Sequence, residues 1–550
     1  MKKSKMIGIA AVSLSAGLLL AACSSSNASG SSDSSGGVPS GVKLPAARVK
    51  ATSSAPAWKQ DTKKAKTLTW FVDQTWWNVN WGQDAVTKQI EKELNIKINF
   101  VVGDDTKLNT YFAGGNLPDI ITNDSMTNQA AQTANKWALP LQTLASKYDP
   151  YFNTVASSQT LDWYKLSNGY SYGYPGFSNT SADYSSGNIK PEEGFVIQKS
   201  IYDALGQPKM DTPADFVKVE KEIKAKYPKD ITMGFTDLAT TVQDLAGVPY
   251  YKDGKYYDRN TDSGYLTWLD AIRQVHQAGG ISDNDFSNNA STLFQQNLSS
   301  GKYATAIVGG AINQAASLQQ WNSAHPADQY IVVNAITPLN GLKPDLSQAG
   351  ISGWLGNYIT KDCKDPEAAI ELFTYLLSEE GQITTTYGVE GQTYTKDSSG
   401  QIKIMPAIKD LTTNNPTKAA QEYGMPDQFA LFGHDKYKAL DPTDSYSPAL
   451  TTFFDWGKGL LTPEFPTENV APKTGTIQAT NYLAIQNNWT TENIALVRAT
   501  SESQFNSIVS QYKSFQNSHG WSAIQSSLNS QVQANLKKLN MSSTASTPNK

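Results

Sequence analysis

Thr67-Leu-Thr-Trp-Phe-Val72 is rich in β-branched and aromatic residues and predicts a buried β-strand. A helix with one apolar face is predicted over 86–94, and the run 96–102 predicts a second strand. A second helix over 107–112 leads to a short strand at 119–122. Strand, helix, strand, helix, strand is the pattern of a parallel α/β sheet with right-handed crossovers.

The loops that follow Val72 and Thr122 are the first places to expect a site, because ligands of such sheets bind beyond the carboxyl ends of the strands. The loop after Val72 combines flat aromatic rings with carboxylates and amides, and the loop after Thr122 begins with an amide and a carboxylate. The candidate ligand-binding residues there are Asp73, Trp76, Trp77, Trp81, Asn123 and Asp124. Indole rings pack against the C–H faces of sugars, and carboxylates and amides pair with hydroxyl groups. Alternatively, one or two of these tryptophans anchor the loop, and Asn123-Asp124 caps a helix.

Further helices are predicted from their end signals. Thr212-Pro213-Ala214-Asp215 forms a cap, and Asp365-Pro366-Glu367 opens another helix that Gly381 should stop. Three more helical segments are predicted at 266–279, 491–518 and 521–539. For Trp137 and Trp268, core packing is the better interpretation than ligand binding.

The N-terminus has the order of a secretory signal peptide: lysines first, then a short apolar run, Ile7 to Ala22. This run of about 16 residues is shorter than the ~20 that a helix needs to cross a bilayer. Leu20-Ala-Ala-Cys23 resembles the bacterial lipobox, so residues 1–22 would be removed and Cys23 would carry the lipid. The alternative is an ordinary signal peptide with an incidental cysteine. The composition predicts a flexible Ser/Gly-rich linker over 23–65 and a disordered tail over 541–550.

Composition and motifs exclude several functions. The net charge of −4 gives no basic field for nucleic acid. With Cys23 assigned to the leader, Cys363 has no partner for an intrachain disulfide. The four histidines form no zinc motif, and no nucleophile elbow, P-loop or regular EF-hand is present, so we expect no cofactor, metal site or catalytic residue. A glycosidase needs only two carboxylates, so hydrolysis stays an alternative. An adhesin or scaffold would show repeats, and none is seen.

Several motifs occur in an order known from one family. Ala113 to Ile121 is similar to its Gly-x-x-Pro-Asp-Ile turn, and Asn168 to Pro175 to its Gly-Lys-x-Tyr-Gly-x-Pro element, with Tyr170 in place of the lysine. Further landmarks follow at 247–250, 253–255, 278–281, 300–304, 363–369, 376–381 and 387–391. In the family an acidic residue often follows directly after this position, whereas here Ser282 follows Ile281 and Asp283 comes one residue later. The chain resembles extracellular solute-binding proteins of family 1, the receptors of bacterial ABC importers, and most closely their Gram-positive sugar and oligosaccharide branch.

The resemblance implies an α/β fold of the periplasmic-binding-protein-like type II, with two lobes joined by a hinge. Lobe 1 would take 66–180 plus 336–395, and lobe 2 would take 181–335 plus 396–540. Tyr174-Pro175 and Thr337-Pro338 are the hinge candidates. In this fold Tyr174, Tyr250 and Trp354 become further candidates for ligand contacts.

The resemblance also implies a function. The protein would be a monomer, anchored through the lipid on Cys23 to the extracellular face of a Gram-positive cell membrane. It would capture a carbohydrate, expected to be an oligosaccharide, by hinge closure and deliver it to an ABC permease whose ATPase is a separate chain. It would not be an enzyme. The alternatives are a receptor for a peptide or another solute and, less favoured, a surface-anchored glycoside hydrolase.

Overall fold

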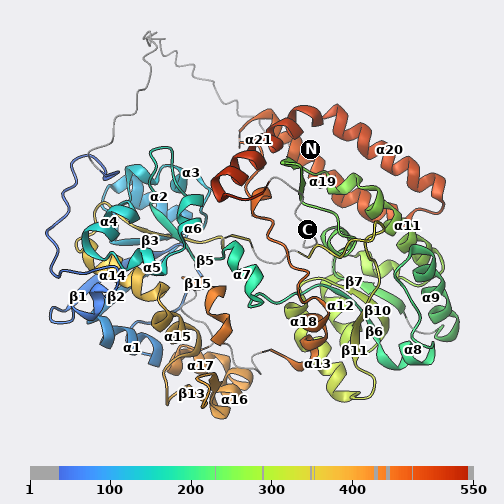
Figure 1. The fold of residues 1–550 in the computed structure, drawn as a ribbon, viewed down its shortest axis with the longest axis horizontal. Helices are drawn as coiled ribbons and strands as arrows, with labels where there is room; N and C mark the ends of the chain where they lie inside the picture. Colours follow the sequence, from blue (N-terminus) through green and yellow to red (C-terminus); the bar gives the residue numbers. More distant parts are fainter. Residues whose placement is uncertain are drawn as a thin grey trace, which may run out of the picture. The chain divides into compact units, whose positions relative to one another are not determined.

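The computed structural model describes residues 36–228, 231–287, 290–346, 350–351, 353–425, 431–440, 446–473 and 475–542. The predicted signal peptide, Cys23 and most of the predicted C-terminal tail lie outside these residues. Two large β-sheets organise the described chain (Figure 1). The residues that pack around the five-stranded sheet are called lobe 1, and those around the four-stranded sheet are called lobe 2.

The sheet of lobe 1 has the strand order β2-β1-β3-β12-β4. Its strands are β1 (Lys66–Val72), β2 (Ile96–Val102), β3 (Ile120–Asn123), β4 (Gly173–Pro175) and β12 (Gly356–Ile359). β1 runs parallel to β2 and β3, which confirms the predicted order, whereas β12 is antiparallel to β3 and β4. The carboxyl ends of β1, β2 and β3 therefore meet at one edge of the sheet.

Alternate side chains of β1 enter the cores on the two faces of this sheet. Leu68, Trp70 and Val72 join a cluster with α1, α4, α5 and α14, while Phe71 packs with α2 on the opposite face. The helices of this region are α1 (Ala85–Leu94), α2 (Asp105–Gly114), α3 (Gln129–Gln132), α4 (Leu141–Tyr148), α5 (Phe152–Val155), α6 (Ser158–Trp163), α14 (Pro366–Leu377) and α15 (Glu379–Tyr387). Trp137 is buried, as predicted.

The predicted stop at Gly381 is wrong. α14 ends at Leu377, and the hydroxyl of the next residue, Ser378, accepts a hydrogen bond from the Gly381 amide and so begins α15. Gly381 is needed for close packing instead, because a Cβ there would lie 1.9 Å from the Tyr375 carbonyl oxygen.

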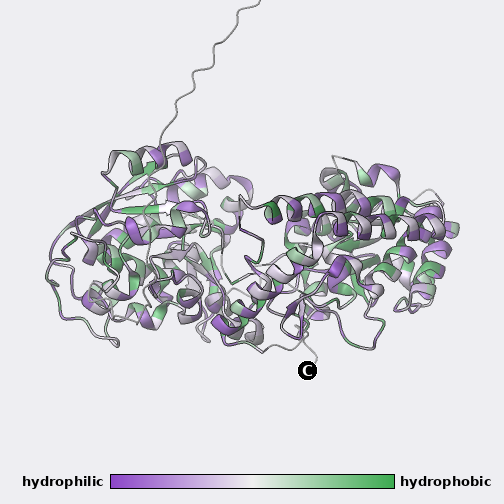
Figure 2. Ribbon diagram, turned by 90° about the horizontal axis from the view of Figure 1, so that it is seen from above, coloured by the Kyte–Doolittle hydropathy of each residue, from purple (hydrophilic) through white to green (hydrophobic). Residues whose placement is uncertain are grey.

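The sheet of lobe 2 has the strand order β11-β6-β10-β7. Its strands are β6 (Gly194–Gln198), β7 (Ile231–Phe235), β10 (Tyr303–Val308) and β11 (Tyr330–Val333). Phe195 and Ile197 face one core cluster and Val196 faces the other. The surrounding helices are α8 (Lys199–Ala204), α9 (Pro213–Lys226), α10 (Thr240–Leu245), α11 (Ser263–Gln277), α12 (Ala290–Ser299), α13 (Ala315–Ala324) and α18 (Thr451–Trp456), and a hairpin pairs β8 (Tyr251–Lys252) with β9 (Lys255–Tyr256). Figure 2 shows mainly hydrophobic strands and hydrophilic stretches along the outer helices.

The C-terminal helices pack on lobe 2. They are α19 (Ile477–Arg498), α20 (Glu502–Ser518) and α21 (Trp521–Leu539), and they share a core cluster with α11 and its buried Trp268, which was predicted to be a core residue. The predicted single segment 491–518 is two helices, because Ser501 caps α20 after a break. Among the described residues no helix combines the length and hydropathy needed to cross a bilayer.

Lobe 1 extends further along the chain than predicted. Leu431 and Phe432 lie in the core of lobe 1, and β15 (Gly433–His434) pairs with β5 (Phe177–Ser178). The intervening elements are β13 (Tyr394–Lys396), β14 (Ile402–Ile404), α16 (Pro406–Asn414) and α17 (Pro416–Tyr423), of which α17 contacts α1. The assignment of 396–425 and 431–434 to lobe 2 is therefore wrong.

Three crossings between the sheets can be followed from the described residues. The chain leaves lobe 1 after β5 through α7 (Ser181–Ser186), returns between β11 and β12, and leaves again after β15. Tyr174-Pro175 lies within β4, just before the first crossing, and Thr337-Pro338 lies within the second. Both hinge candidates thus remain close to crossings.

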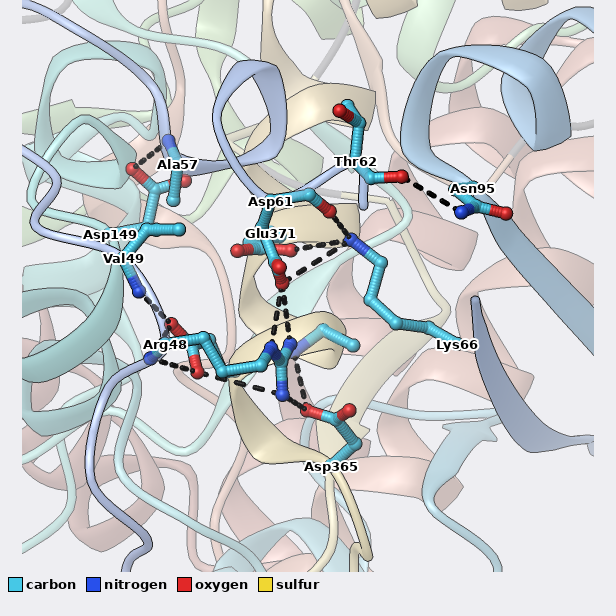
Figure 3. A network of polar contacts seen from close by, with 12 residues as sticks. Arg48, Val49, Ala57, Asp61, Thr62, Lys66, Asn95, Asp149, Asp365 and Glu371 are labelled. Atoms are coloured by element: carbon cyan, nitrogen blue, oxygen red, sulfur yellow. Dashed lines mark hydrogen bonds and ion pairs between the residues drawn. The ribbon is translucent and has the colours of Figure 1, made fainter. Parts of the chain in front are cut away.

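The segment 37–65 differs from the flexible linker expected there. Arg48 forms ion pairs with Asp61 and Asp365, and its backbone amide donates to Glu367 (Figure 3). Trp58 is buried in the core of lobe 1. Charge pairing and one indole ring hold a segment that contains few large apolar residues, so its composition alone suggested disorder.

Candidate functional site

Three carboxylates meet at the edge of the lobe 1 sheet where the parallel strands end. Asp73 follows β1, Asp124 follows β3, and Asp105 is the first residue of α2, which begins after β2. One carboxylate oxygen of each lies within 4.8 Å of the other two. We call these three residues the carboxylate cluster. The parallel strand order explains why residues far apart in the sequence converge here.

The members of the cluster differ in exposure. Asp73 is only 4% exposed, Asp124 is half-buried and Asp105 is exposed. The amide of Asn128 donates to Asp124 at 3.2 Å, whereas Asp73 Oδ2 has no hydrogen-bond partner among the described residues. The cluster is therefore open to solvent on the Asp105 side and closed on the Asp73 side.

Burial and mutual repulsion change the protonation of the cluster. Burial, with the negative charges of Asp105 and Asp124, raises the pKa of Asp73 to about 7. Burial and the charge of Asp105 also raise the pKa of Asp124. Near neutral pH, Asp73 therefore carries its proton for part of the time.

Two exposed indole rings lie side by side close to this edge. Trp76 and Trp354 are 55% and 57% exposed, and their ring centroids are 6.5 Å apart at an interplanar angle of 52°. The Trp76 ring is oriented by a 2.7 Å hydrogen bond from its Nε1 to Gln74 Oε1. We call these two residues the tryptophan pair.

The tryptophan pair lines a hollow of about 220 Å³. Its other walls come from residues with small, apolar or polar side chains: Gly176, Phe177, Gly353, Leu355, Gln382, Thr385, Thr386 and Gly433. Gly353 allows the chain to pass close to β5, because a Cβ there would lie 2.8 Å from that of Phe177. This close approach brings Trp354 to Trp76 from a segment remote in the sequence.

The other two loop tryptophans serve as anchors. Trp77 is 4% exposed and packs edge-on against Phe100, with centroids 5.7 Å apart. Trp81 is half-buried, packs on the same Phe100 ring and donates from Nε1 to the Ile96 carbonyl at 3.2 Å. The loop thus presents Trp76 while Trp77 and Trp81 attach it to β2.

Asn123 and Tyr174 lie inside lobe 1. Both are 0% exposed. Asn123 donates to the Ser125 carbonyl and to Asn128 Oδ1, so it orders the loop that carries Asp124. The Tyr174 hydroxyl accepts from the Ser157 amide at 3.0 Å, and its ring packs on Phe432.

Tyr250 belongs to lobe 2 and is half-buried there. Its hydroxyl donates to Asp244, and the Arg259 guanidinium lies 3.8 Å from its ring centroid. These contacts hold the ring within its own lobe, whereas Asp73, Asp124, Trp76 and Trp354 belong to one edge of lobe 1. Cys23, the predicted lipidation site, lies outside the described residues.

Asp105 and the walls contributed by Phe177 and α15 were not among the residues predicted from the sequence. A signal existed for Asp105, because it is an acid shortly after a predicted strand, as Asp73 and Asp124 are. Gln382 and Thr385 carry no sequence signal, since they are ordinary polar residues of a helix.

A second hollow, of about 280 Å³, lies between residues of lobe 1 and α21. Tyr164, Tyr172 and Tyr358 line it from lobe 1, and Gln531, Asn535 and Lys538 from α21. Lys538 donates to the Trp163 carbonyl and stacks over the Trp163 ring. Part of the polar lining of this hollow is thus used to join α21 to α6.

Solved structures share this fold at low sequence identity. The alginate-binding protein AlgQ2 without calcium ion aligns with a TM-score of 0.58 and 17% identity over 86% of this chain and 98% of its own. An extracellular solute-binding protein from Bifidobacterium longum subsp. infantis aligns with a TM-score of 0.58 and 14% identity over 88% of this chain and 100% of its own. An EF-hand mutant of the S. pneumoniae ABC-transporter substrate-binding protein FusA, in complex with fructo-nystose, aligns with a TM-score of 0.58. Its identity is 15% over 85% of this chain and 99% of its own. These similarities confirm the predicted two-lobed fold.

Comparison with curated proteins finds no match. Comparison with family models matches residues 79–383, more than half of the chain, to the family described as bacterial extracellular solute-binding protein. The match spans the carboxylate cluster except Asp73, and it includes Trp354 and most of both sheets. This chain belongs to the bacterial extracellular solute-binding protein family.

Proposed function

We propose that this protein captures a carbohydrate as the receptor of an ABC importer. The tryptophan pair carries the proposal. Two large apolar rings left more than half exposed, 6.5 Å apart and lining a hollow, are unusual on a protein surface and suit the flat C–H faces of sugar rings.

The predicted site residues divide into two roles in this proposal. Trp76 and Trp354 stack on the sugar, and Asp124 accepts hydrogen bonds from its hydroxyls, while the buried Asp73 is the least accessible of these four residues. Asn123, Trp77, Trp81 and Tyr174 position the loops that carry these groups. Tyr250 would add a contact from lobe 2 when hinge closure brings the lobes onto the ligand.

The ligands of similar proteins support a carbohydrate over a peptide. AlgQ2 is named as an alginate-binding protein, and FusA was solved with fructo-nystose. At 15–17% identity these structures share the fold with this chain, and the choice of a carbohydrate rests on the tryptophan pair.

The remaining parts of the proposal concern the cell surface. Cys23 would carry the lipid that holds the protein, as a monomer, on the extracellular face of the membrane. A separate permease would recognise the closed state and receive the sugar, and a separate ATPase would supply the energy. Radiolabelled lipid incorporation into the wild type but not into Cys23→Ala would test the anchor.

A thermal-shift screen of the purified protein against oligosaccharides and short peptides tests the ligand class. A ligand at a hundredfold excess over its Kd stabilises the fold by about 2.7 kcal/mol. We expect a saturable shift with a saccharide that is lost in Trp76→Ala and Trp354→Ala. Leu483→Ala, which truncates an apolar side chain 61% exposed on α19, should keep the shift. A shift with peptides alone would contradict the carbohydrate proposal.

One observation favours the hydrolase as a second candidate. Asp73 has a raised pKa beside other carboxylates, as the general acid of a glycosidase has. However, the three acids converge to within 4.8 Å of one another, whereas glycosidases place two acids about 5–10 Å apart on either side of the scissile bond. Recovery of the bound saccharide decides the question, because a receptor returns it intact and a hydrolase returns it shortened.

A further inference from the structure

The carboxylate cluster holds more negative charge than the chain around it neutralises. No ion pair within the described part of the chain involves Asp73, Asp105 or Asp124. The ammonium group of Lys107, on the same helix as Asp105, donates instead to the Val102 carbonyl at 3.0 Å. Three acids this close repel one another unless a cation or a proton lies between them.

Asp73 adds a second, independent observation. It is 4% exposed, and its Oδ2 has no hydrogen-bond partner among the described residues although it is buried. An unpaired buried carboxylate oxygen costs free energy, and a proton or a bound cation lowers this cost. The carboxylate of Asp73 lies in the cluster, within 4.8 Å of the other two.

We propose that Asp73, Asp105 and Asp124 bind one divalent cation, Ca²⁺ in preference to Mg²⁺. Carboxylate oxygens are the ligands that both ions prefer. Calcium bonds of about 2.4 Å join oxygens up to about 4.8 Å apart and tolerate an irregular set of ligands, whereas Mg²⁺ demands near-ideal octahedral geometry at about 2.1 Å. The exposed position of Asp105 leaves a side open for water ligands.

This site is distinct from the stretch Asp258-x-Asn260-x-Asp262, which has the spacing of the start of a calcium loop but has Leu269 and not Glu at the twelfth position. There Asp258 accepts hydrogen bonds from Gln516 and Thr261, and Asp262 caps α11, so these acids are occupied within lobe 2. The proposed cation belongs to lobe 1 and uses acids from three separate strand ends. The cation site shares Asp124 with the proposed sugar contacts, but it needs no sugar to form, because all three ligands are side chains of this chain.

Isothermal titration of the chelator-treated full chain with CaCl₂ alone tests the proposal. We expect saturable binding of one Ca²⁺ per chain with a Kd of about 10⁻⁵–10⁻³ M, and weaker binding of MgCl₂. Asp105→Asn and Asp124→Asn should each weaken binding at least tenfold. The titrations contain no saccharide, so a failed sugar screen and a failed cation titration are distinguishable results.

Asp104→Asn is the matched control. Asp104 is adjacent to Asp105 and caps α2 by accepting from the Lys107 amide at 3.1 Å, and asparagine caps helices equally well. This variant should bind Ca²⁺ like the wild type. Heat-unfolding curves of every variant establish that each one is folded. The proposal is overturned if the folded wild type binds no Ca²⁺ up to 10 millimolar (about ten times the weakest expected Kd), or if Asp105→Asn and Asp124→Asn bind it unchanged.

Discussion

The two ends of strand β1 differ in the partners of their buried charged residues. At the amino end, Lys66 is 3% exposed and its ammonium group contacts Glu371 at 3.1 Å. Just past the carboxyl end, Asp73 is 4% exposed and its neighbours are two further acids. One strand of seven residues thus separates a network with its own cations from a cluster that forms no ion pair with the described residues.

At the Lys66 end, Asp61, Asp365 and Glu371 of the network in Figure 3 each contact a base, whereas Asp149 accepts a hydrogen bond from the Ala57 amide. Arg48 pairs with Asp61 and Asp365, and Lys66 pairs with Glu371. Burying a charge is costly unless a partner is buried with it, so ion pairs formed within the chain, as at Lys66 and Arg48, serve the fold. Where the partner is missing, as at the Asp73 end, we expect an external ligand to supply it.

The largest effect should come from removing a cation at the Lys66 end. Lys66→Met keeps the length of the side chain but leaves Glu371 buried without its base, so the free energy of unfolding should fall by about 4 kcal/mol. Urea denaturation measures this change. Lys59→Met is the control, because Lys59 pairs with Glu380 on the surface and such pairs contribute less than about 1 kcal/mol. Equal losses in both variants would show that burial does not distinguish the two pairs.

The adjacent residues Trp76 and Trp77, at the Asp73 end, should differ in their effect on stability, because one ring is exposed and the other is packed in the core. Trp77→Ala removes a buried ring from its contact with Phe100 and should lower the free energy of unfolding by about 3 kcal/mol. Trp76→Ala removes an exposed ring and should leave stability within about 0.5 kcal/mol. If denaturant titrations give both variants the same stability, Trp77 does not anchor the loop.

Sequence periodicity was enough to predict β1, β2, β3 and the helices between them, because their pattern is local. It was not enough to tell Trp76 from Trp77. Which ring is exposed depends on Phe100 and on Trp354, which comes from a distant segment. The ordered segment around Arg48 was missed for the same reason, since the Glu367 that binds its amide lies 319 residues away.

Neutralising a charge at the Asp73 end should raise the free energy of unfolding, whereas Lys66→Met should lower it. The folded-state pKa of Asp73 is about 7 against an ordinary value of 3.8. Between these pH values the folded state therefore holds a proton on Asp73 that the unfolded state has released. This group therefore reduces stability progressively as pH rises from 3.8 to about 7, with the full penalty above that. In a chelator, Asp73→Asn should be about 2 kcal/mol more stable than the wild type at pH 8, and the gain should vanish near pH 3.

The groups that face Asp73 and contribute to this penalty are Asp105 and Asp124. Asp162→Asn, which removes an exposed acid paired with Lys165, should show no such pH dependence. Unfolding midpoints measured across this pH range give the comparison. A loss of stability in Asp73→Asn at pH 8 would mean that the chain does hold a cationic partner for Asp73, and the contrast between the two ends of β1 would disappear.

The smallest effect concerns the coupling between Trp76 and Trp354. If both rings contact one sugar, each alanine variant weakens binding about tenfold or more, and the double variant loses less than the sum of the two free-energy changes. The expected coupling is about 0.5–1.5 kcal/mol, the range of aromatic pairs, and saccharide titrations of the four proteins measure it. Strict additivity would mean that the rings bind independently. Coupling would show that the exposed rings, like the unpaired carboxylates beside them, are completed by a ligand and not by the chain.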